Sequence, residues 1–403
     1  MRLIIVLYCI FFHATVHAQV GQPFPGWQPG YLDIHHINTG RGEAVFFMLP
    51  DGTTMLEDAG DIPRTKPRVT DPKPNAERTS GEWISRYILH MLEGQKEKKL
   101  NYILLSHFHG DHMGKITPGM KVSLSGAYKL SGITEVGETI PFDKIIDRGW
   151  NYPSPPKGEL FVNYTQFVNW QVKNKKVKAE QFQPGHRDQI TLVHDAAKYP
   201  GFVIQNIASN GKVWTGTEQR TKDFFPPLDS LKDSQYPDEN MCSNAFRLSY
   251  GKFDYFNGGD MTSGIIPGSW RDIEYPVGLA TEQVDVCEAN HHAYYDAMST
   301  GFLKSVRPRV YIIQACVPSH PTTGSLARML SEEIYPGPRD VFSTNVMQET
   351  KVVVGENIDK MKSQQGHIII RVDPGGATYN IFILDDSEEN YKVKAVFGPY
   401  SSN

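Results

Sequence analysis

The sequence predicts an α/β (α+β) fold in which helices and strands are layered, and two stretches of the chain carry this prediction. Residues 31–106 show the succession strand, turn, strand, helix and strand. Residues 245–335 show a hairpin followed by helices and a further strand. This succession is typical of a layered domain with one buried core. A β-rich tail follows at 340–400.

Local patterns justify each element of the first stretch. The run EAVFFML is apolar enough for a buried strand, and the residues Pro-Asp-Gly after it favour a turn. Ser80 can cap the helix that follows, because its hydroxyl can accept a backbone hydrogen bond. The expected elements are strands at 43–49, 53–58 and 101–106, a turn at 50–52, a polar loop at 61–80 and a helix at 81–95.

The second half gives equally local signals. Apolar runs broken by a Gly or by Asp-Pro-Gly-Gly indicate hairpins, whereas apolar residues at helical spacing indicate helices. The expected elements are a hairpin at 245–256, helices near 293–304 and 322–335, a strand at 309–315, and strands at 340–345, 367–372, 378–384 and 391–397.

Residues 135–240 differ in composition, since they are rich in Pro, Lys, Asn and Asp. Only a helix at 159–173 and a strand at 202–208 stand out there. We therefore expect a long insertion over the face of the domain. It is either a lid or polymer-binding wall or simply a solvated charged segment.

These boundaries predict one main domain, at 29–335, that contains the insertion. The β-rich segment 336–403 either completes this domain or is appended to it. The 403 residues would allow two or three domains by length alone.

The N-terminus reads as a secretory signal peptide over residues 1–18. Arg2 supplies a positive charge, residues 3–12 form an apolar run too short to span a bilayer, and Val16 and Ala18 precede the expected cleavage site. We therefore expect an exported protein, periplasmic or secreted, with no membrane span in the mature chain. Three cysteines remain after cleavage, so the chain is no disulfide scaffold, although one disulfide stays open.

The charge balance indicates which charged partners the protein could bind. There are 41 Lys and Arg against 45 Asp and Glu, which gives a net charge of -4. No global positive field is available to hold a polyanion. A nucleic-acid substrate would need a local basic patch or metal ions.

The sharpest chemical signal is the run SHFHGDH at 106–112, directly after a predicted strand. His107 and His109 are two residues apart, so an extended backbone projects both to one side. Asp111 and His112 can face a second cation after the turn. Imidazole nitrogens with a carboxylate suit Zn²⁺, with Mn and Fe as alternatives. The pattern predicts a metal site for two divalent ions.

This run resembles the HxHxDH hallmark of the metallo-β-lactamase-fold superfamily, and the chain is most similar to ComEC-type hydrolase domains and choline-phosphate esterases. The resemblance covers most of residues 31–335 and implies an αββα sandwich with the metals at one edge. Further stretches match the family's motifs: TTMLEDAG at 53–60, NGGD at 257–260, VDVCEANHHA at 284–293 and SHP at 319–321.

The resemblance assigns roles to individual residues. It implies that Asp58 orients a metal-binding imidazole and that Asp260 bridges the two ions. The implied ligands of the first ion are His107, His109 and Asp260, and those of the second are Asp111, His112, His292 and Asp260.

Two points of this assignment stay open. We favour His292 as the ligand and expect His291 to line the pocket, although their roles could be exchanged. The family's third motif, usually a lone histidine, has only His186 and His194 as candidates, and neither follows a strand as the motif requires. His35 and His36 are expected to be structural.

The predicted reaction is metal-assisted hydrolysis, since two adjacent cations can supply hydroxide at neutral pH. No nucleophile elbow or P-loop is present. Besides the metal ligands, we expect catalytic roles for Asp111, His291 and His320. The favoured substrate is a phosphodiester or phosphate ester, as a small molecule or a polymer. The alternatives are a lactone, lactam or thioester hydrolase, and an exported binding protein with a degenerate site.

Overall fold

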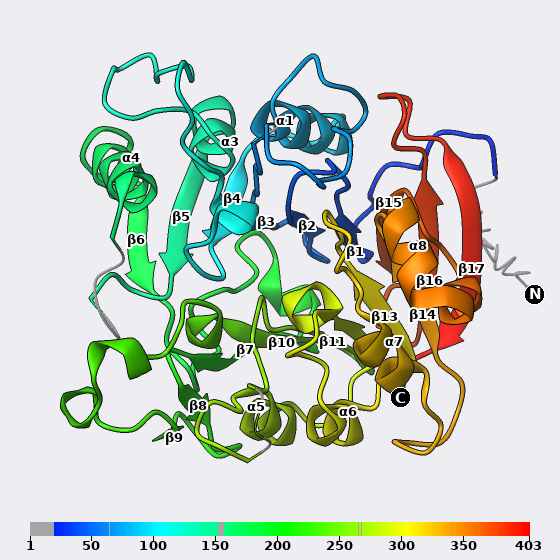
Figure 1. Cartoon of the computed structure of the whole chain (residues 1–403). Coiled ribbons are helices and arrows are strands. Elements are labelled where there is room, and N and C mark those ends of the chain that lie inside the picture. Colours follow the sequence, from blue (N-terminus) through cyan, green and yellow to red (C-terminus); the bar gives the residue numbers. More distant parts are fainter. Residues whose placement is uncertain (1–19, 64, 152–156, 265, 267) are drawn as a thin grey trace, which may run out of the picture.

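The computed structural model of the chain describes residues 20–403 except 64, 152–156, 265 and 267 (Figure 1). The predicted signal peptide at 1–18 lies outside the described residues, so the signal peptide and export stay predictions. Within the described part of the chain, no helix is long and apolar enough to cross a membrane.

In the part of the chain that the structure describes, seventeen strands form two mixed sheets. The first sheet contains β1 (Leu32–His36), β2 (Val45–Met48), β3 (Thr54–Glu57), β4 (Leu100–Leu104), β5 (Phe142–Asp147), β6 (Lys178–Gln181), β15 (His367–Val372), β16 (Thr378–Leu384) and β17 (Val393–Ser401). The second contains β7 (Phe202–Ser209), β8 (Lys212–Trp214), β9 (Thr221–Asp223), β10 (Ala245–Tyr250), β11 (Phe253–Asn257), β12 (Val286–Glu288), β13 (Val310–Ile313) and β14 (Asp340–Ser343). The strand orders are β17-β16-β15-β1-β2-β3-β4-β5-β6 and β14-β13-β12-β11-β10-β7-β8-β9.

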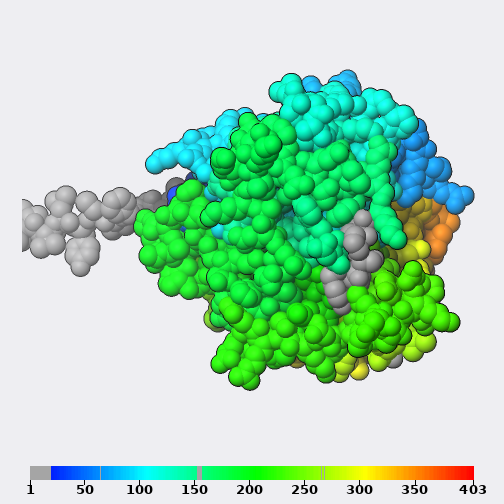
Figure 2. Space-filling view, turned by 90° about the vertical axis from the view of Figure 1, so that its left-hand side faces the viewer, coloured from blue at the N-terminus to red at the C-terminus, as the bar shows by residue number. Residues whose placement is uncertain are grey.

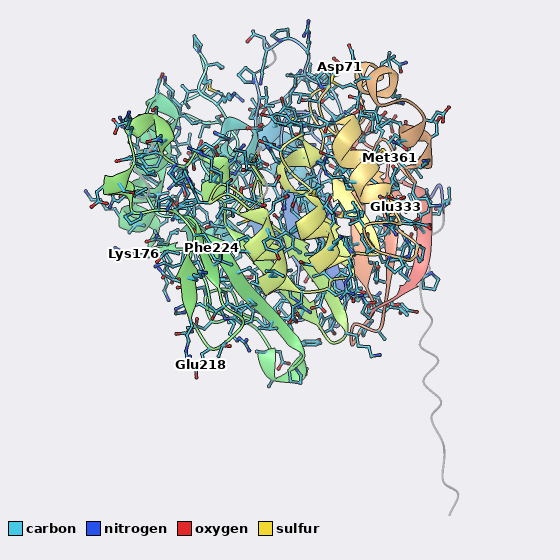
Figure 3. The ribbon with its side chains drawn as sticks, turned by 60° about the horizontal axis from the view of Figure 1, so that its bottom comes forward. Asp71, Lys176, Glu218, Phe224, Glu333 and Met361 are labelled. Atoms are coloured by element: carbon cyan, nitrogen blue, oxygen red, sulfur yellow. The ribbon has the colours of Figure 1, made fainter. Side chains whose placement is uncertain are left out.

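Helices cover the outer face of each sheet (Figure 1). They are α1 (Ser80–Met91), α2 (Gly110–Met113), α3 (Ile133–Thr139), α4 (Glu159–Lys175), α5 (Glu274–Thr281), α6 (Thr300–Val306), α7 (Thr323–Leu330) and α8 (Gln348–Val354). Figure 3 views the molecule with the helices over the second sheet brought forward, and there Phe224 lies on one side and Met361 on the other.

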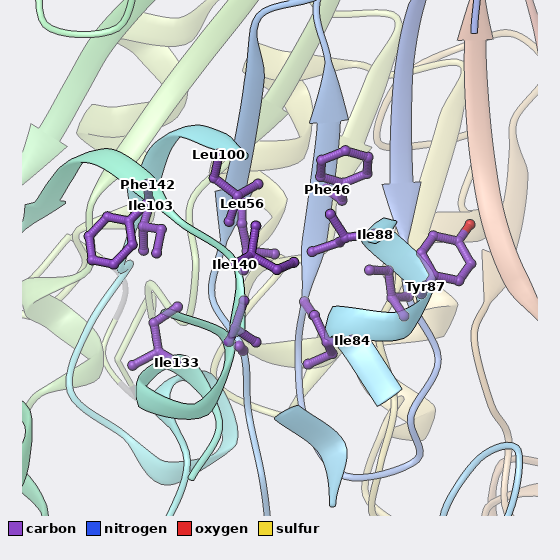
Figure 4. Packing of buried hydrophobic residues seen from close by; sticks show 14 of the residues in the cluster. Phe46, Leu56, Ile84, Tyr87, Ile88, Leu100, Ile103, Ile133, Ile140 and Phe142 are labelled. Carbon is purple, nitrogen blue, oxygen red and sulfur yellow. The ribbon is translucent and has the colours of Figure 1, made fainter. Parts of the chain in front are cut away.

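Alternation of side chains along the strands creates three apolar layers. In β3, Leu56 packs outward against α1 and α3, whereas Met55 points to the space between the sheets. In β4, Ile103 likewise packs outward, whereas Tyr102 points to the space between the sheets. Figure 4 shows the outer layer of the first sheet, where Leu56 and Ile103 lie among side chains of α1 and α3. The chain is therefore the αββα sandwich that the sequence resemblance implied.

The start of α1 differs slightly from expectation. Thr79, not Ser80, is the N-cap, and its hydroxyl accepts the backbone N–H of Glu82 at 3.2 Å. The Glu82 side chain in turn accepts the N–H of Thr79, which completes a capping box. Ser80, the predicted cap, is instead the first residue of the helix, and its hydroxyl donates to Asp61 at 3.0 Å.

The segment 135–240, expected as an insertion over the face, contributes strands to both sheets. β5 and β6 pair parallel to β4 and extend the first sheet, and β7 to β9 extend the second. Most side chains of β6 are exposed, so this edge strand carries no apolar signal in the sequence. Seen from the side of β6, this green part of the chain covers most of the surface (Figure 2).

The segment 336–403 completes the domain and is not an appendage. β14 joins the second sheet beside β13, whereas β15 pairs with β1 in the interior of the first sheet. The expected helix at 293–304 starts later, at Thr300, because a turn intervenes. The three described cysteines, Cys242, Cys287 and Cys316, are free and buried.

Candidate metal centre

Three loops carry the candidate ligands to one edge of the sandwich. His107 to His112 follow β4, Asp260 follows β11, and His291 and His292 follow β12. β11, β12 and β13 are parallel, so their carboxyl ends open at the same edge. His320 follows β13 and reaches that edge too. Parallel strands place polar residues from distant parts of the chain in one crevice.

The Asp260 carboxylate lies at the centre of this cluster, with imidazoles on both of its oxygens. Oδ1 is 3.2 Å from Nε2 of His112 and 3.4 Å from Nε2 of His292. Oδ2 is 3.6 Å from Nε2 of His107 and 3.9 Å from Nε2 of His291. Burial favours the neutral carboxyl, but these imidazoles, His112 foremost, hold the pKa of Asp260 well below its usual value.

Two overlapping groups of side chains have the geometry to hold a cation. His107, His109 and Asp260 form the first cation site. His112, His292 and Asp260, with Glu43 beside them, form the second cation site. In each group the ligand atoms lie within 4.8 Å of one another. Asp260 belongs to both groups, as a bridging carboxylate would.

Unpartnered polar atoms show that these residues fit divalent cations. Nε2 of His112, Oδ1 of Asp260 and both ring nitrogens of His292 are buried, and none has a hydrogen-bond partner among the described residues. Leaving such atoms unsatisfied costs about 1–3 kcal/mol each. A cation bound between them would satisfy these atoms together, and imidazole with carboxylate is the donor set that Zn²⁺, Mn²⁺ and Fe²⁺ share.

Asp58 and Ser106 orient two of the imidazoles. Nδ1 of His112 donates to Oδ2 of Asp58 at 2.7 Å, which directs Nε2 of His112 toward Asp260. Ser106 donates to Asp58 through its backbone N–H at 2.8 Å and through Oγ at 2.5 Å. Oγ can then accept Nδ1–H of His107 at 3.1 Å, so that Nε2 of His107 is left free of a proton. Carboxylate–histidine pairs of this kind hold ligands ready for a metal.

Sequence reasoning missed Glu43, which stands behind His292 as Asp58 stands behind His112. Its Oε2 is 3.3 Å from Nδ1 of His292, and the side chain is buried. Burial and the neighbouring Glu288 raise the pKa of Glu43 well above its usual value. The only signal in the sequence is a carboxylate that opens an otherwise apolar strand segment.

Two glycines allow the loop of α2 to approach β2 and β3. A Cβ atom at Gly60 would lie 1.9 Å from the backbone oxygen of Asp111, and one at Gly42 would lie 2.5 Å from it. The same oxygen accepts the N–H of Glu43 at 2.8 Å. The Asp-x-Gly motif at Asp58 and Gly60 therefore combines an orienting carboxylate with a position that only glycine can occupy.

Asp111 lies beside the cluster but in neither cation site. Burial raises the pKa of its carboxyl, but His112 and its other imidazole neighbours outweigh burial and lower it. Its expected roles as a ligand and in catalysis stay predictions. His186 and His194 lie elsewhere. His186 pairs with Asp188 at 3.0 Å, and the backbone N–H of His194 donates to Asp51.

The turn that carries His291 and His292 has unusual backbone geometry. His291, His292 and Ala293 have φ values of 46°, 53° and 59°, in the left-handed region. This conformation costs about 1–2 kcal/mol per non-glycine residue. Strain of this kind collects at functional sites, where surrounding contacts maintain it. The turn directs the two consecutive imidazoles to different oxygens of Asp260.

His291 and His320 are placed near the cation sites without belonging to either group. Nδ1 of His291 donates to Asp296 at 2.8 Å, and its Nε2 is 3.1 Å from Nδ2 of Asn240. The buried ring of His320 stacks on His292, with centroids 4.4 Å apart and an angle of 22° between the planes. Of the other paired histidines, His35 is hydrogen-bonded to the Tyr87 hydroxyl, as a structural residue would be.

One short segment, residues 239–244, holds the ligand loops together, and we call it the brace. Oε1 of Glu239 accepts the backbone N–H of Phe108, which lies between the ligands His107 and His109, at 2.9 Å. Both carboxylate oxygens of Glu239 accept from the guanidinium of Arg148 at 2.6 Å. Arg148 is buried and also stacks on the Phe108 ring.

The remaining residues of the brace reach the other loops. Oγ of Ser243 accepts the backbone N–H of Asp260 at 3.2 Å. The backbone N–H of Asn244 donates to Ser106, and its side chain donates to the backbone oxygen of Leu105. Together with the contact between Asn240 and His291, these bonds connect the brace to the loops after β4, β11 and β12. The positions of ligands from three loops thus depend on one segment.

Comparisons with known proteins add little to this geometry. No family model matches the chain, and no curated protein matches it. Among solved structures, a diphosphatase of the PhnP family is 10% identical and covers 86% of this chain and 98% of its own, with a TM-score of 0.34. The short form of human tRNase Z is 12% identical over 69% of this chain and 91% of its own, at 0.32. The unliganded yeast protein PDE1 is 9% identical over 84% and 99%, at 0.34. The fold and the site therefore rest on the chain's own geometry.

We expect Glu239→Gln to weaken metal binding. The amide can still accept the N–H of Phe108, but it removes the negative charge that Glu239 brings to the buried guanidinium of Arg148. Metal affinity should fall by at least about tenfold, as for other residues that support ligands. The free energy of unfolding should fall by about 3–5 kcal/mol. Isothermal titration with Zn²⁺ and urea denaturation measure the two effects.

Glu218→Gln is the matched control, because Glu218 pairs with Arg220 on the surface and both side chains are more than two-thirds exposed. This variant should change neither quantity measurably. Unchanged metal affinity in Glu239→Gln would show that the brace supports the fold alone.

Proposed function

We propose that this protein is a metal-dependent hydrolase that acts on phosphodiesters. The observation that carries the proposal is the buried Asp260 carboxylate, which faces Nε2 of His112 and Nε2 of His292, two ring nitrogens without a hydrogen-bond partner among the described residues. His107, His109 and Asp260 would hold one divalent cation. His112, His292 and Asp260 would hold another, supported by Asp58 and Glu43. When bound, such a pair of cations activates a water molecule. It also polarises the oxygen of the leaving group or the phosphoryl oxygen that gains negative charge.

The residues around the cation sites suit a phosphoryl group. His291 is partly exposed, and its Nδ1 is bonded to Asp296, so its ring is held in one orientation beside Asp260. Burial opposes the charged form, but Asp260 and Asp296 raise the pKa of His291 to about 8. This partly exposed imidazole can contact a substrate oxygen beside the cation sites. His109 is partly exposed as well, which leaves the first cation site open to a substrate.

The motif resemblance also favours a phosphoester over a carbonyl substrate. The set formed by Asp260, the His291-His292 pair and His320 is the one that resembles phosphodiester-cleaving members of the superfamily. Lactamases of that superfamily usually carry a histidine in the third motif, and neither His186 nor His194 reaches the centre.

Diesters should therefore be hydrolysed faster than β-lactams or lactones. The test is a panel of bis-p-nitrophenyl phosphate, p-nitrophenyl phosphorylcholine, nitrocefin and a lactone, each with Zn²⁺ and with Mn²⁺. We expect kcat/KM to be highest for a phosphodiester. Rapid nitrocefin cleavage without phosphodiester hydrolysis would favour the carbonyl alternative, and no turnover of any substrate by metal-loaded protein would favour a binding protein.

His320 should act in the reaction without binding a metal. Its stacked position beside His292 places it next to the second cation site, yet it is in neither ligand group. Loss of a positioned donor typically costs about 10²–10⁴ in rate. We expect His320→Ala to keep both metals while kcat falls by at least about tenfold. Metal analysis and steady-state kinetics on the best diester measure this.

The matched control is His186→Ala, which removes a partly exposed imidazole outside the centre and should leave kcat unchanged. If His320→Ala loses a metal, then His320 supports the ligands and does not act on substrate. If kcat is unchanged, His320 is a packing residue.

A further inference from the structure

A cavity of about 750 Å³ lies beside the metal centre, between the loop that follows Asp260 and the loop that follows His292. Its walls include Ser263, Asp272, Tyr275, Tyr295, Thr300 and Arg328. None of these residues belongs to the cation sites, and no sequence motif marks them. They come from the two loops and from helices α5, α6 and α7.

Direct contacts join this cavity to the candidate active site. Ser263 donates its backbone N–H to the backbone oxygen of Asp296 at 2.7 Å, and the carboxylate of Asp296 binds His291. The Tyr294 ring is 5.1 Å from the ring of His291 and 4.5 Å from the ring of Tyr295. Two ring contacts thus separate His291 from the wall of the cavity. The wall of the cavity is therefore one aromatic ring away from His291.

Two tyrosines present aromatic surface to the cavity. Tyr275 is 45% exposed and Tyr295 is 56% exposed, which is unusual for large aromatic side chains in an otherwise well-packed fold. No hydrogen bond among the described residues involves either hydroxyl group. A Cβ atom at Gly301 would lie 2.7 Å from the Tyr275 ring, so the glycine leaves room for the ring at the start of α6.

Arg328 brings positive charge to the same cavity. Its guanidinium donates to the backbone oxygens of Ala297 at 2.8 Å and Met298 at 2.9 Å, and no carboxylate forms an ion pair with it among the described residues. Asp272 is the other charged residue of the wall. Its oxygens already accept the backbone N–H groups of Gly268 and Tyr275 at 3.1 and 3.2 Å. Nε and Nη2 of Arg328 are thus used within the fold, since Nη2 also donates to Oγ of Ser325, and Nη1 is the group left for an oxygen of a ligand.

We infer that this cavity binds a planar aromatic group, such as a nucleobase, that the phosphodiester substrate carries on the side that stays with the phosphate. Tyr275 and Tyr295 supply the stacking surfaces, and Arg328 faces an oxygen of the same group. The inference rests on the proposed function, because the phosphate must sit at the cation sites. It narrows the substrate class to phosphodiesters with a ring system.

Two substrates with the same leaving group test the inference. Thymidine 5′-(p-nitrophenyl phosphate) and methyl p-nitrophenyl phosphate both release p-nitrophenolate when water adds to phosphorus and the P–O bond to the aryl group breaks. They differ in the group that stays on the phosphate, which is a nucleoside in one and a methyl group in the other. The ratio of their kcat/KM values reports binding in the cavity, with the chemistry held constant.

We expect the metal-loaded wild-type protein to prefer the thymidine substrate. Tyr275→Ala and Tyr295→Ala should each lower kcat/KM for that substrate by at least about fivefold, mainly through KM, since stacking on an aromatic side chain is worth about that much or more. Neither variant should change kcat/KM for the methyl substrate. Tyr275→Phe and Tyr295→Phe keep the ring and should restore wild-type values. Leu279→Ala, which alters an exposed residue of α5 outside this cavity, is the control.

The outcomes separate the cavity from the proposed function. If the wild type hydrolyses both substrates with equal kcat/KM, or if the tyrosine variants retain the wild-type ratio, the cavity does not bind the ring. If neither substrate is hydrolysed with Zn²⁺ or Mn²⁺, the proposed phosphodiesterase function itself fails. A loss on both substrates in the alanine variants, with metals bound, would show that the tyrosines only support the ligand loops.

Discussion

The burial of one carboxylate among imidazoles is the constraint on which the rest of this structure depends. A buried carboxylate such as that of Asp260 is unfavourable unless positive charge or hydrogen-bond donors surround it. The neighbouring imidazoles provide this only in part, because several inward atoms of the cluster have no partner. The arrangement therefore has the donor atoms and the geometry that could hold divalent cations. Asp58 and Asp296 each accept a hydrogen bond from the far nitrogen of one histidine and so direct the near nitrogen to the centre. Glu43 lies 3.3 Å from the far nitrogen of His292.

The sandwich makes this cluster possible by bringing the carboxyl ends of strands from both sheets to one edge. β4 of the first sheet and β11 and β12 of the second sheet carry the ligands, and their loops must be held against one another. The brace does this through Glu239, Ser243 and Asn244, whose hydrogen bonds cross between loops that are distant in sequence. Gly60 and Gly42 permit the loop of α2 to approach β2 and β3 closely. Strain in the turn at His291 and His292 is tolerated because contacts of His291 with Asn240 and Asp296 hold the turn.

Motifs that act locally could be predicted from the sequence. The HxHxDH run, Asp58 before Gly60, and Asp260 after a hairpin strand are short patterns whose spacing reflects one strand and one turn. The elements with strong apolar periodicity, such as α1 and β13, were also predictable. Thr79 and Ser80 show the limit, since adjacent residues offered the same cap.

The remainder depends on contacts between distant segments and gives no local signal. Glu43 reads as the polar start of an apolar strand, and only the folded chain shows that it faces His292. Glu239 lies in a polar stretch whose pairing with Arg148 and Phe108 spans about a hundred residues. The strand β5 and the edge strand β6 were hidden by the same polar composition that predicted an insertion. The cavity between α5, α6 and α7 has no motif at all.

The number of metal ions per chain tests the central claim most directly. The protein, stripped of metal and then dialysed against Zn²⁺, should contain two ions per chain by plasma mass spectrometry. Asp260→Asn keeps the shape of the side chain but removes the charge that both cation sites share, so it should retain at most one ion while the far-ultraviolet circular dichroism spectrum stays unchanged. A folded Asp260→Asn variant that still binds two ions, or a wild-type protein that binds none, would contradict the account.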